Sequence, residues 1–276
     1  MLKLRILTAL ILIPLVLAGI FLLPEDYFSL VVAIILVIAS LEWTHIAHIK
    51  SHSVRAIFAL CIFLITYLPD FYQFDLVKII VPVSVTWLFV ALWLHFDPVS
   101  KVRGYSRQPF WILFSLLVGV FYLVPAGFAL IYLHHATSLG PAFILFCLLL
   151  VWTADIAAYL SGRRWGRHKL APLISPGKTW EGVYGALAAG LVLSLSGSYL
   201  LGYRGPLLLW LSLCGVLTIV MSVYGDLFES VFKRAGDIKD SGHMLPGHGG
   251  VLDRIDSLLV AAPFFATGLI LMSERA

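Results

Sequence analysis

Residues 225–256 read GDLFESVFKRAGDIKDSGHMLPGHGGVLDRID and concentrate carboxylates, lysines, arginines and two histidines in a chain that is otherwise largely apolar. Apolar stretches long enough to cross a bilayer flank this run on both sides. Ionisable groups are costly beside hydrocarbon, so a cluster this dense between two such stretches is by default functional. The run therefore predicts a membrane protein with a polar site held by helix ends.

Composition places the whole chain in the same class. Of its 276 residues, 61% are hydrophobic and only 12% are charged, and the mean hydropathy is +0.97. Apolar runs of about 20 residues recur, the length a helix needs to cross roughly 30 Å of hydrocarbon. We predict an all-α, polytopic integral membrane protein and exclude a soluble domain. The nine predicted spans are 6–23, 27–48, 54–69, 77–96, 110–133, 141–161, 181–202, 206–232 and 255–273.

The first span has a basic lead like that of a secretory signal, but no small-x-small cleavage site precedes Pro24. We expect it to be retained. If the N-terminus is cytoplasmic and the loops alternate sides, 16 of the 19 lysines and arginines lie on the cytoplasmic side, as the positive-inside rule requires. Two long polar segments, 162–180 and 233–254, then face the cytoplasm. We divide the chain into N-terminal transmembrane helices, 1–140, and a C-terminal part, 141–276, that carries the chemistry.

The first polar segment follows a span that contains Asp155 and Tyr159, four residues apart and therefore on one helix face. An aspartate this deep in an apolar span faces either a polar cavity or a partner on another helix. Arg163 and Arg164, flanked by glycines, suit phosphate oxygens, but the sequence slightly favours a plain positive-inside loop with a helix-ending glycine.

The stretch SPGKT, residues 175–179, is not a phosphate-binding P-loop. That loop needs a glycine five residues before Gly177, where this chain has Pro172. Ser175 and Lys178 remain candidates for substrate contact, and Thr179 is a plausible cap for the following helix.

The second polar segment has the more specific pattern. Asp226, Glu229 and Lys233 are spaced to share one face at the end of a helix, and Asp253 and Asp256 repeat the three-residue spacing where the next helix begins. Magnesium is usually held by one or two carboxylates plus substrate phosphates, whereas zinc would require Cys or His ligands that this pattern lacks.

Between these carboxylates lies PGHGG, residues 246–250, whose glycines can present backbone N–H groups to an anion. His248 is either a proton carrier or a group that fixes the loop. Countercharge for phosphate comes from four cations, Lys233, Arg234, Lys239 and Arg254. Carboxylates for a metal and cations for phosphate favour phosphoryl or nucleotidyl transfer. The alternative is a solvated loop whose charges pair with one another.

The run from Ser230 to Asp256, SVFKR, four residues, KDSG, then LPGHGGVLDRID, resembles the signature of the phosphatidate cytidylyltransferase family without a gap. The span carrying Asp155 and Tyr159 and the stretch ISPGKTWEG, residues 174–182, are also similar to that family. The resemblance covers the C-terminal half in detail. The first 140 residues match only as generic spans.

This resemblance implies transfer of CMP from CTP to phosphatidic acid, with pyrophosphate released, at the inner membrane of a bacterium. It implies Mg²⁺, with or without a second cation, as cofactor, the bilayer but no nucleic acid as partner, and a homodimer. The implied metal ligands are Asp226, Asp253 and Asp256. The implied catalytic residues are Lys233, Arg234, Lys239, Asp240, His248 and Arg254. The implied substrate-binding residues are Asp155, Tyr159, Ser175, Lys178, Thr179, Gly249 and Gly250.

Two other functions stay open. A CTP-dependent lipid kinase of the dolichol-kinase type would use related motifs but leave no cytidine on the lipid. A transporter would place its intramembrane carboxylates near the bilayer midplane between inverted repeats, and the sequence shows no such repeat.

Overall fold

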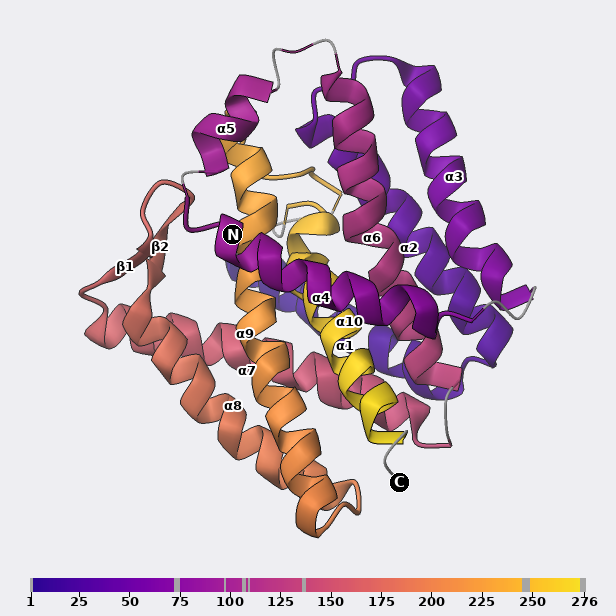
Figure 1. Cartoon of the computed structure of the whole chain (residues 1–276), viewed down its shortest axis with the longest axis vertical. Coiled ribbons are helices and arrows are strands. Elements are labelled where there is room, and N and C mark those ends of the chain that lie inside the picture. The colour runs from indigo at the N-terminus through magenta and orange to yellow at the C-terminus, as the bar shows by residue number, and fades with distance from the viewer. Residues whose placement is uncertain are drawn as a thin grey trace.

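The computed structural model describes residues 2–71, 75–96, 98–105, 108, 110–135, 138–244 and 249–273. Within these ranges the chain forms helices and one short antiparallel hairpin (Figure 1). The helices are α1 (Leu2–Leu22), α2 (Glu25–Ile46), α3 (His52–Phe71), α4 (Val77–Trp93), α5 (Pro98–Tyr105), α6 (Trp111–His135), α7 (Gly140–Trp165), α8 (Trp180–Leu200), α9 (Gly205–Ala235) and α10 (Leu252–Ser273). The strands are β1 (Lys169–Ala171) and β2 (Ser175–Thr179).

The class predicted from the sequence, a polytopic helical membrane protein, is confirmed. Each predicted span coincides with a helix. Among the described residues, six helices are long and apolar enough to cross a membrane, or seven if α4 and α5, which meet at 105°, count as one span. The count of nine is not confirmed. The apolar stretches Leu10–Leu22 of α1 and His52–Leu68 of α3 are shorter than the roughly 18 residues that a spanning helix needs.

Two elements were not predicted. The polar segment 162–180, expected to be a loop, contains the end of α7 at Trp165 and the β1–β2 hairpin, in which Lys169 pairs with Thr179 and Ala171 with Ser175. Helix α5 lies in the expected loop between the fourth and fifth spans and packs against α9. Both lie beside the same end of α9 in Figure 1.

Helix α8 shows how the helices divide between protein and lipid. Its buried positions carry small residues, among them Ala186, Gly190 and Ser194, whereas Val192 and Leu200 are exposed. Lipid is as apolar as leucine, so helices in a membrane associate through close packing of small residues rather than by hiding hydrophobic ones. This pattern suits a helix that packs on α7 and α9 and turns its outer face to the bilayer.

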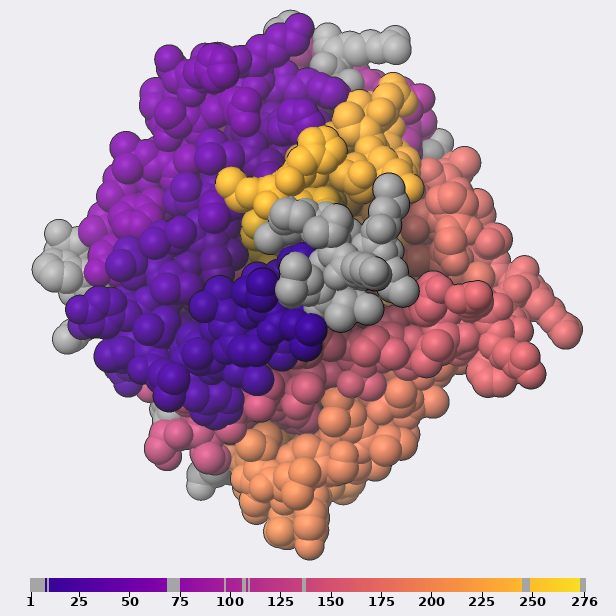
Figure 2. All heavy atoms as spheres, turned by 180° about the vertical axis from the view of Figure 1, so that it is seen from behind, coloured from indigo at the N-terminus to yellow at the C-terminus, as the bar shows by residue number. Residues whose placement is uncertain are grey.

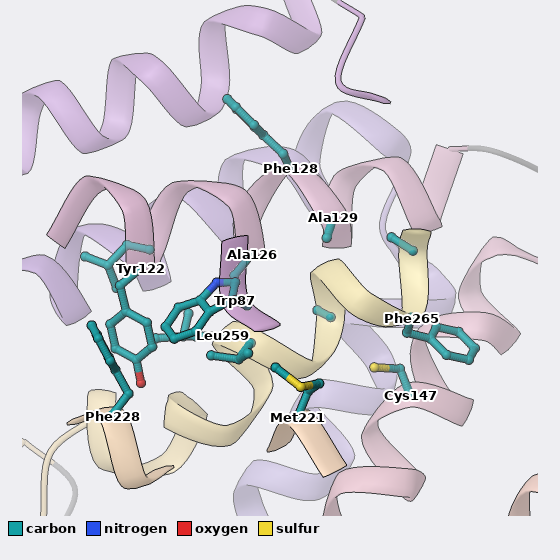
Figure 3. Close-up of a cluster of buried hydrophobic side chains, with 14 of the residues drawn as sticks. Trp87, Tyr122, Ala126, Phe128, Ala129, Cys147, Met221, Phe228, Leu259 and Phe265 are labelled. Carbon is teal, nitrogen blue, oxygen red and sulfur yellow. The ribbon is translucent and has the colours of Figure 1, made fainter. Parts of the chain in front are cut away.

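Helices from both halves of the chain share one aromatic cluster near the polar site. Tyr122 of α6 lies between Trp87 of α4 and Phe228 of α9, and its hydroxyl points toward the crossing of α9 and α10 (Figure 3). That hydroxyl donates to the backbone carbonyl of Asp256 at 3.1 Å. The division at residue 140 stays a prediction, because this core joins the two parts.

Helices α9 and α10 pack tightly at this crossing. A Cβ added to Gly225 of α9 would lie 2.7 Å from the carbonyl oxygen of Asp256. The glycine therefore lets the two helix ends that carry the predicted metal ligands come together.

Candidate active site

A pocket of about 660 Å³ opens between α7, the hairpin, the C-terminal part of α9 and the first turns of α10. It brings together residues that the sequence predicted from four separate segments. The predicted residues that line it are Asp155, Tyr159, Ser175, Lys178, Thr179, Asp226, Lys233, Asp240, Asp253, Arg254 and Asp256. We call this the site pocket.

An ion pair fastens the hairpin to α9. The Nζ of Lys178 lies 2.7 Å from Oδ2 of Asp226 and also donates to the carbonyl of Val223 at 3.3 Å. The other carboxylate oxygen of Asp226 accepts from the Ser230 hydroxyl at 3.2 Å. Lys178 and Asp226 keep side-chain exposures of 25% and 31%, so both remain open to a ligand.

The base of the site pocket is a buried charge cluster around Lys233. Its Nζ donates to Oδ1 of Asp253 at 2.7 Å and lies 3.3 Å from Oε1 of Glu229. Asp253 also accepts from the backbone N–H groups of Ser241, at 3.0 Å, and Gly250, at 2.9 Å. Removing either partner of such a buried pair leaves a charge without compensation. Asp253 therefore holds the loop between α9 and α10 in place, in addition to lining the pocket.

Sequence reasoning missed Glu42, which comes from α2 in the N-terminal half. Its buried carboxylate accepts from the backbone N–H groups of Val251, at 3.1 Å, and Leu252, at 2.7 Å. It also accepts from the Ser241 hydroxyl at 3.2 Å. A carboxylate suits the start of α10, where N–H groups lack helical partners and the helix dipole is positive. A lone glutamate in an apolar predicted span was the available signal.

Glu42 also constrains the glycines of the loop. A Cβ on Gly250 would lie 2.6 Å from its carboxylate, so no larger residue fits there without a shift. The N–H of Gly250 is already bonded to Asp253. Neither Gly250 nor Gly249, whose φ is +85°, lines the site pocket. Their proposed contacts with the nucleotide stay predictions.

A second missed carboxylate, Glu181, closes the hairpin. It accepts from the backbone N–H groups of Arg167, at 3.1 Å, and His168, at 3.2 Å, and from Nδ1 of His168 at 2.7 Å. The predicted cap is confirmed, because the Thr179 hydroxyl accepts from the N–H of Gly182 at 3.2 Å. Thus the start of α8 positions the hairpin, and with it Lys178, over the site pocket.

Two predicted cations lie outside the site pocket. Arg234 and Lys239 line a different pocket, and His248 falls outside the described residues. Arg234 donates to the carbonyls of Ile174 and Ile238, both at 3.2 Å, which ties the hairpin to the end of α9. Arg254, by contrast, lines the site pocket and forms no salt bridge within the described part of the chain.

The donor set suits a hard divalent cation in part. Within the described ranges, no three Asp, Glu, His or Cys side chains are grouped to hold a metal by themselves. Asp226 and Asp256 nevertheless line the same pocket, and both oxygens of the buried Glu229 lack a hydrogen bond. Because magnesium is typically bound by one or two carboxylates with substrate phosphates completing the shell, these residues fit a cation that arrives with a nucleotide. The assignment of Asp226, Asp253 and Asp256 as ligands stays a prediction.

Fold and site together define a polytopic membrane protein with a charged pocket built for phosphate chemistry at a helix-bundle end. The chain belongs to the cytidylyltransferase family, whose pattern it matches over residues 3–272. It is 38% identical to the phosphatidate cytidylyltransferase of Haemophilus influenzae, over 96% of this chain and 98% of that protein. It is also 38% identical to the phosphatidate cytidylyltransferase of Pseudomonas aeruginosa, over 96% of each chain. The one from Staphylococcus haemolyticus is 35% identical over 98% of this chain and all of the relative.

Proposed function

We propose that this chain is a phosphatidate cytidylyltransferase, which transfers CMP from CTP to phosphatidate and releases pyrophosphate. One observation carries the proposal. The site pocket gathers all of the signature aspartates, Asp240, Asp253 and Asp256, with the signature cations Lys233 and Arg254, and the similarity to the named relatives extends over nearly the full chain. The N-terminal half, which the sequence motifs left undefined, contributes through Glu42.

The chemistry follows from the charges. A phosphate oxygen of phosphatidate attacks the α-phosphorus of CTP, and a new P–O bond forms as the bond to the bridging oxygen breaks. The electron pair leaves with pyrophosphate. Phosphatidate is already anionic near neutral pH, so the barrier lies in bringing anions together and in stabilising the leaving charge. Lys178 and Lys233 supply cations that line the site pocket. Arg254 also lines it, and we assign it to a substrate phosphate because it forms no salt bridge within the described residues.

We also propose a Mg²⁺ cofactor. When bound, it would neutralise phosphate charge, and Asp226 and Asp256 would hold it. Asp155 also opens into this pocket and would orient substrate or complete the set of oxygen ligands. The homodimer implied by the family resemblance stays a prediction.

The length of α9 supports a site at the membrane surface. Its 31 residues extend about 46 Å at 1.5 Å per residue, whereas the hydrocarbon core is roughly 30 Å thick and needs about 20 residues. If α9 enters the core at Gly205, it leaves it near Tyr224. Asp226, Glu229 and Lys233 then lie at headgroup level, where CTP from water and phosphatidate from the bilayer can meet. The bias of lysine and arginine favours the cytoplasmic side.

Position-specific labels of CTP test the proposal. With purified protein, magnesium and phosphatidic acid in mixed micelles, label on the α-phosphate should end in the lipid and label on the γ-phosphate in pyrophosphate. A lipid kinase would place the γ label in the lipid, and a transporter would leave both labels in CTP. Either of these results would overturn the assignment. Activity that persists after chelation of divalent metal would remove the cation from the mechanism.

A further inference from the structure

A second pocket, of about 810 Å³, reaches the tip of the hairpin at Leu173. Helix α5, the hairpin tip and the segment after α9 form its walls. Its lining residues are Val99, Ser100, Arg103, Gly104, Leu173, Arg234, Asp237, Ile238 and Lys239. Within the described residues it shares no lining residue with the site pocket.

The stretch that resembles the family signature, residues 230–256, contributes adjacent residues to the linings of the two pockets. Lys233 lines the site pocket and Arg234 the second pocket, because neighbouring residues on an α-helix point about 100° apart. Farther along, Asp240 lines the site pocket and Lys239 the second pocket. The two cations that the sequence assigned to the catalytic site therefore belong to a separate cavity.

The second pocket carries a surplus of positive charge. Among the described lining residues, three cations, Arg103, Arg234 and Lys239, accompany the single carboxylate of Asp237. Arg103 donates to Oδ1 of Asp237 at 2.6 Å and to the backbone carbonyl of Arg234 at 2.9 Å. Because the Asp237 side chain is 81% exposed, water screens its charge, and the guanidinium stays attractive to a second anion.

Apolar side chains complete the lining. Val99 and Ile238 are partly buried at the wall, and Leu173 is 68% exposed at the hairpin tip. A pocket with cations on one part and aliphatic groups on another suits a phosphate joined to an apolar body better than it suits a free, strongly hydrated anion.

The second pocket lies where we place the membrane surface. Helix α5 runs at 105° to α4 and carries Lys101, Arg103 and the exposed Tyr105, a combination typical of helices that lie in the headgroup layer. It packs beside the end of α9, the part that extends beyond the hydrocarbon by the length argument above. Figure 2, seen from behind, shows the gold segment after α9 at the surface, between the N-terminal helices and the salmon region of the hairpin.

We propose that the second pocket binds the phosphate of an anionic phospholipid, as a site distinct from the catalytic one. Arg103, Arg234 and Lys239 hold the phosphate, and Val99, Leu173 and Ile238 contact the glycerol and the first acyl carbons. The bound lipid would join α5, the hairpin tip and the segment after α9.

The test measures lipid binding by the full chain in neutral detergent, with native mass spectrometry and increasing phosphatidylglycerol. Ser100→Asp adds a negative charge to the lining without removing Arg103, and should weaken the first binding step about fivefold. Asp237→Asn removes the competing charge and should strengthen it by a similar factor. Asn also tolerates the positive φ of 55° at this position. The matched control is Lys101→Ala, because Lys101 is an exposed cation of the same helix outside the pocket; it should bind as the unaltered chain does.

A parallel titration with inorganic pyrophosphate separates a lipid from a soluble phosphate. If pyrophosphate binding follows the variants and phosphatidylglycerol binding does not, the pocket takes soluble phosphate and the lipid proposal is wrong. Equal binding of phosphatidylglycerol by Ser100→Asp, Asp237→Asn and the control would also overturn it. Opposite shifts in the two pocket variants would support it, since a general loss of structure cannot strengthen binding.

Discussion

At the residue scale, the two aspartates of the DRID motif lie in different surroundings although they are one helical turn apart. Asp253 accepts hydrogen bonds from Lys233 and from two backbone N–H groups. Asp256 lines the same pocket, and its Oδ1 accepts from the N–H of Ser257 at 2.7 Å. The carboxylate of Asp253 is therefore occupied by hydrogen bonds within the protein, whereas that of Asp256 keeps oxygen lone pairs that a ligand can use.

We therefore expect the two Asp→Asn changes to have different effects. Asp256→Asn should lower turnover by about 100-fold or more while leaving thermal stability unchanged, because a carboxamide keeps the size but loses the charge that holds a cation. Asp253→Asn should also destabilise the fold, by about 3 kcal/mol, since the buried Lys233 loses its shortest partner. Turnover against magnesium concentration and thermal unfolding in detergent measure both effects. Normal activity in folded Asp256→Asn would remove this residue from the site.

At the scale of elements, Glu42 of α2 fixes the start of α10 by accepting hydrogen bonds from its first N–H groups. The sequence predicted the charged face of α9 and the first turn of α10 from their three- and four-residue spacing, and the structure brings these residues into one pocket. Spacing could not reveal Glu42, because it lies 209 residues or more from the N–H groups that it accepts. Nor could it reveal that Arg234 turns away from Lys233 into a second pocket.

Replacement of Glu42 tests this contact. Glu42→Gln keeps the volume but loses the negative charge and one acceptor, and should destabilise the protein by about 2 kcal/mol, the range for hydrogen bonds to charged groups. The amides of Val251 and Leu252 should exchange hydrogen faster. Turnover should fall, because the loop between α9 and α10 loses a group that holds it. Glu25→Gln, on the exposed first turn of the same helix, is the matched control. Unchanged exchange at Leu252 in Glu42→Gln would show that the carboxylate does not hold this helix start.

The crossing of α9 and α10 gives a second prediction at this scale. Gly225→Ala places a methyl group 2.7 Å from the backbone carbonyl of Asp256, which cannot swing aside as a side chain can. The helices must separate, so we expect a loss of about 1–3 kcal/mol in stability and reduced turnover. Gly19→Ala is the control, because its methyl would meet only the tip of Leu23 at 4.0 Å. Equal thermal midpoints for the two variants would contradict the packing described for this crossing.

At the scale of the whole molecule, the polytopic class and the positions of the long helices could be predicted, because hydrocarbon forces every spanning segment into a helix of known length. The number of spans could not, since α1, α3 and the bent pair α4–α5 fall near the limits of length and apolar character. The hairpin was also missed. Its strands are only three and five residues long, and Glu181 fixes it by hydrogen bonds to backbone groups 13 and 14 residues away, which leave no periodic pattern.

The two ends of α8 test the orientation of the chain in the membrane. If α8 crosses the bilayer, Arg167 before it and Arg204 after it lie on opposite sides, with Arg167 cytoplasmic by the positive-inside rule. Single cysteines at these exposed positions should therefore react with an impermeant thiol reagent from opposite faces of sealed vesicles. The background needs Cys61→Ser, because Cys61 is exposed, whereas Cys147 and Cys214 are buried. Labelling of both positions from one side would mean that α8 does not cross, and the hairpin and α9 could then not bring Lys178 and Asp226 together at one membrane surface.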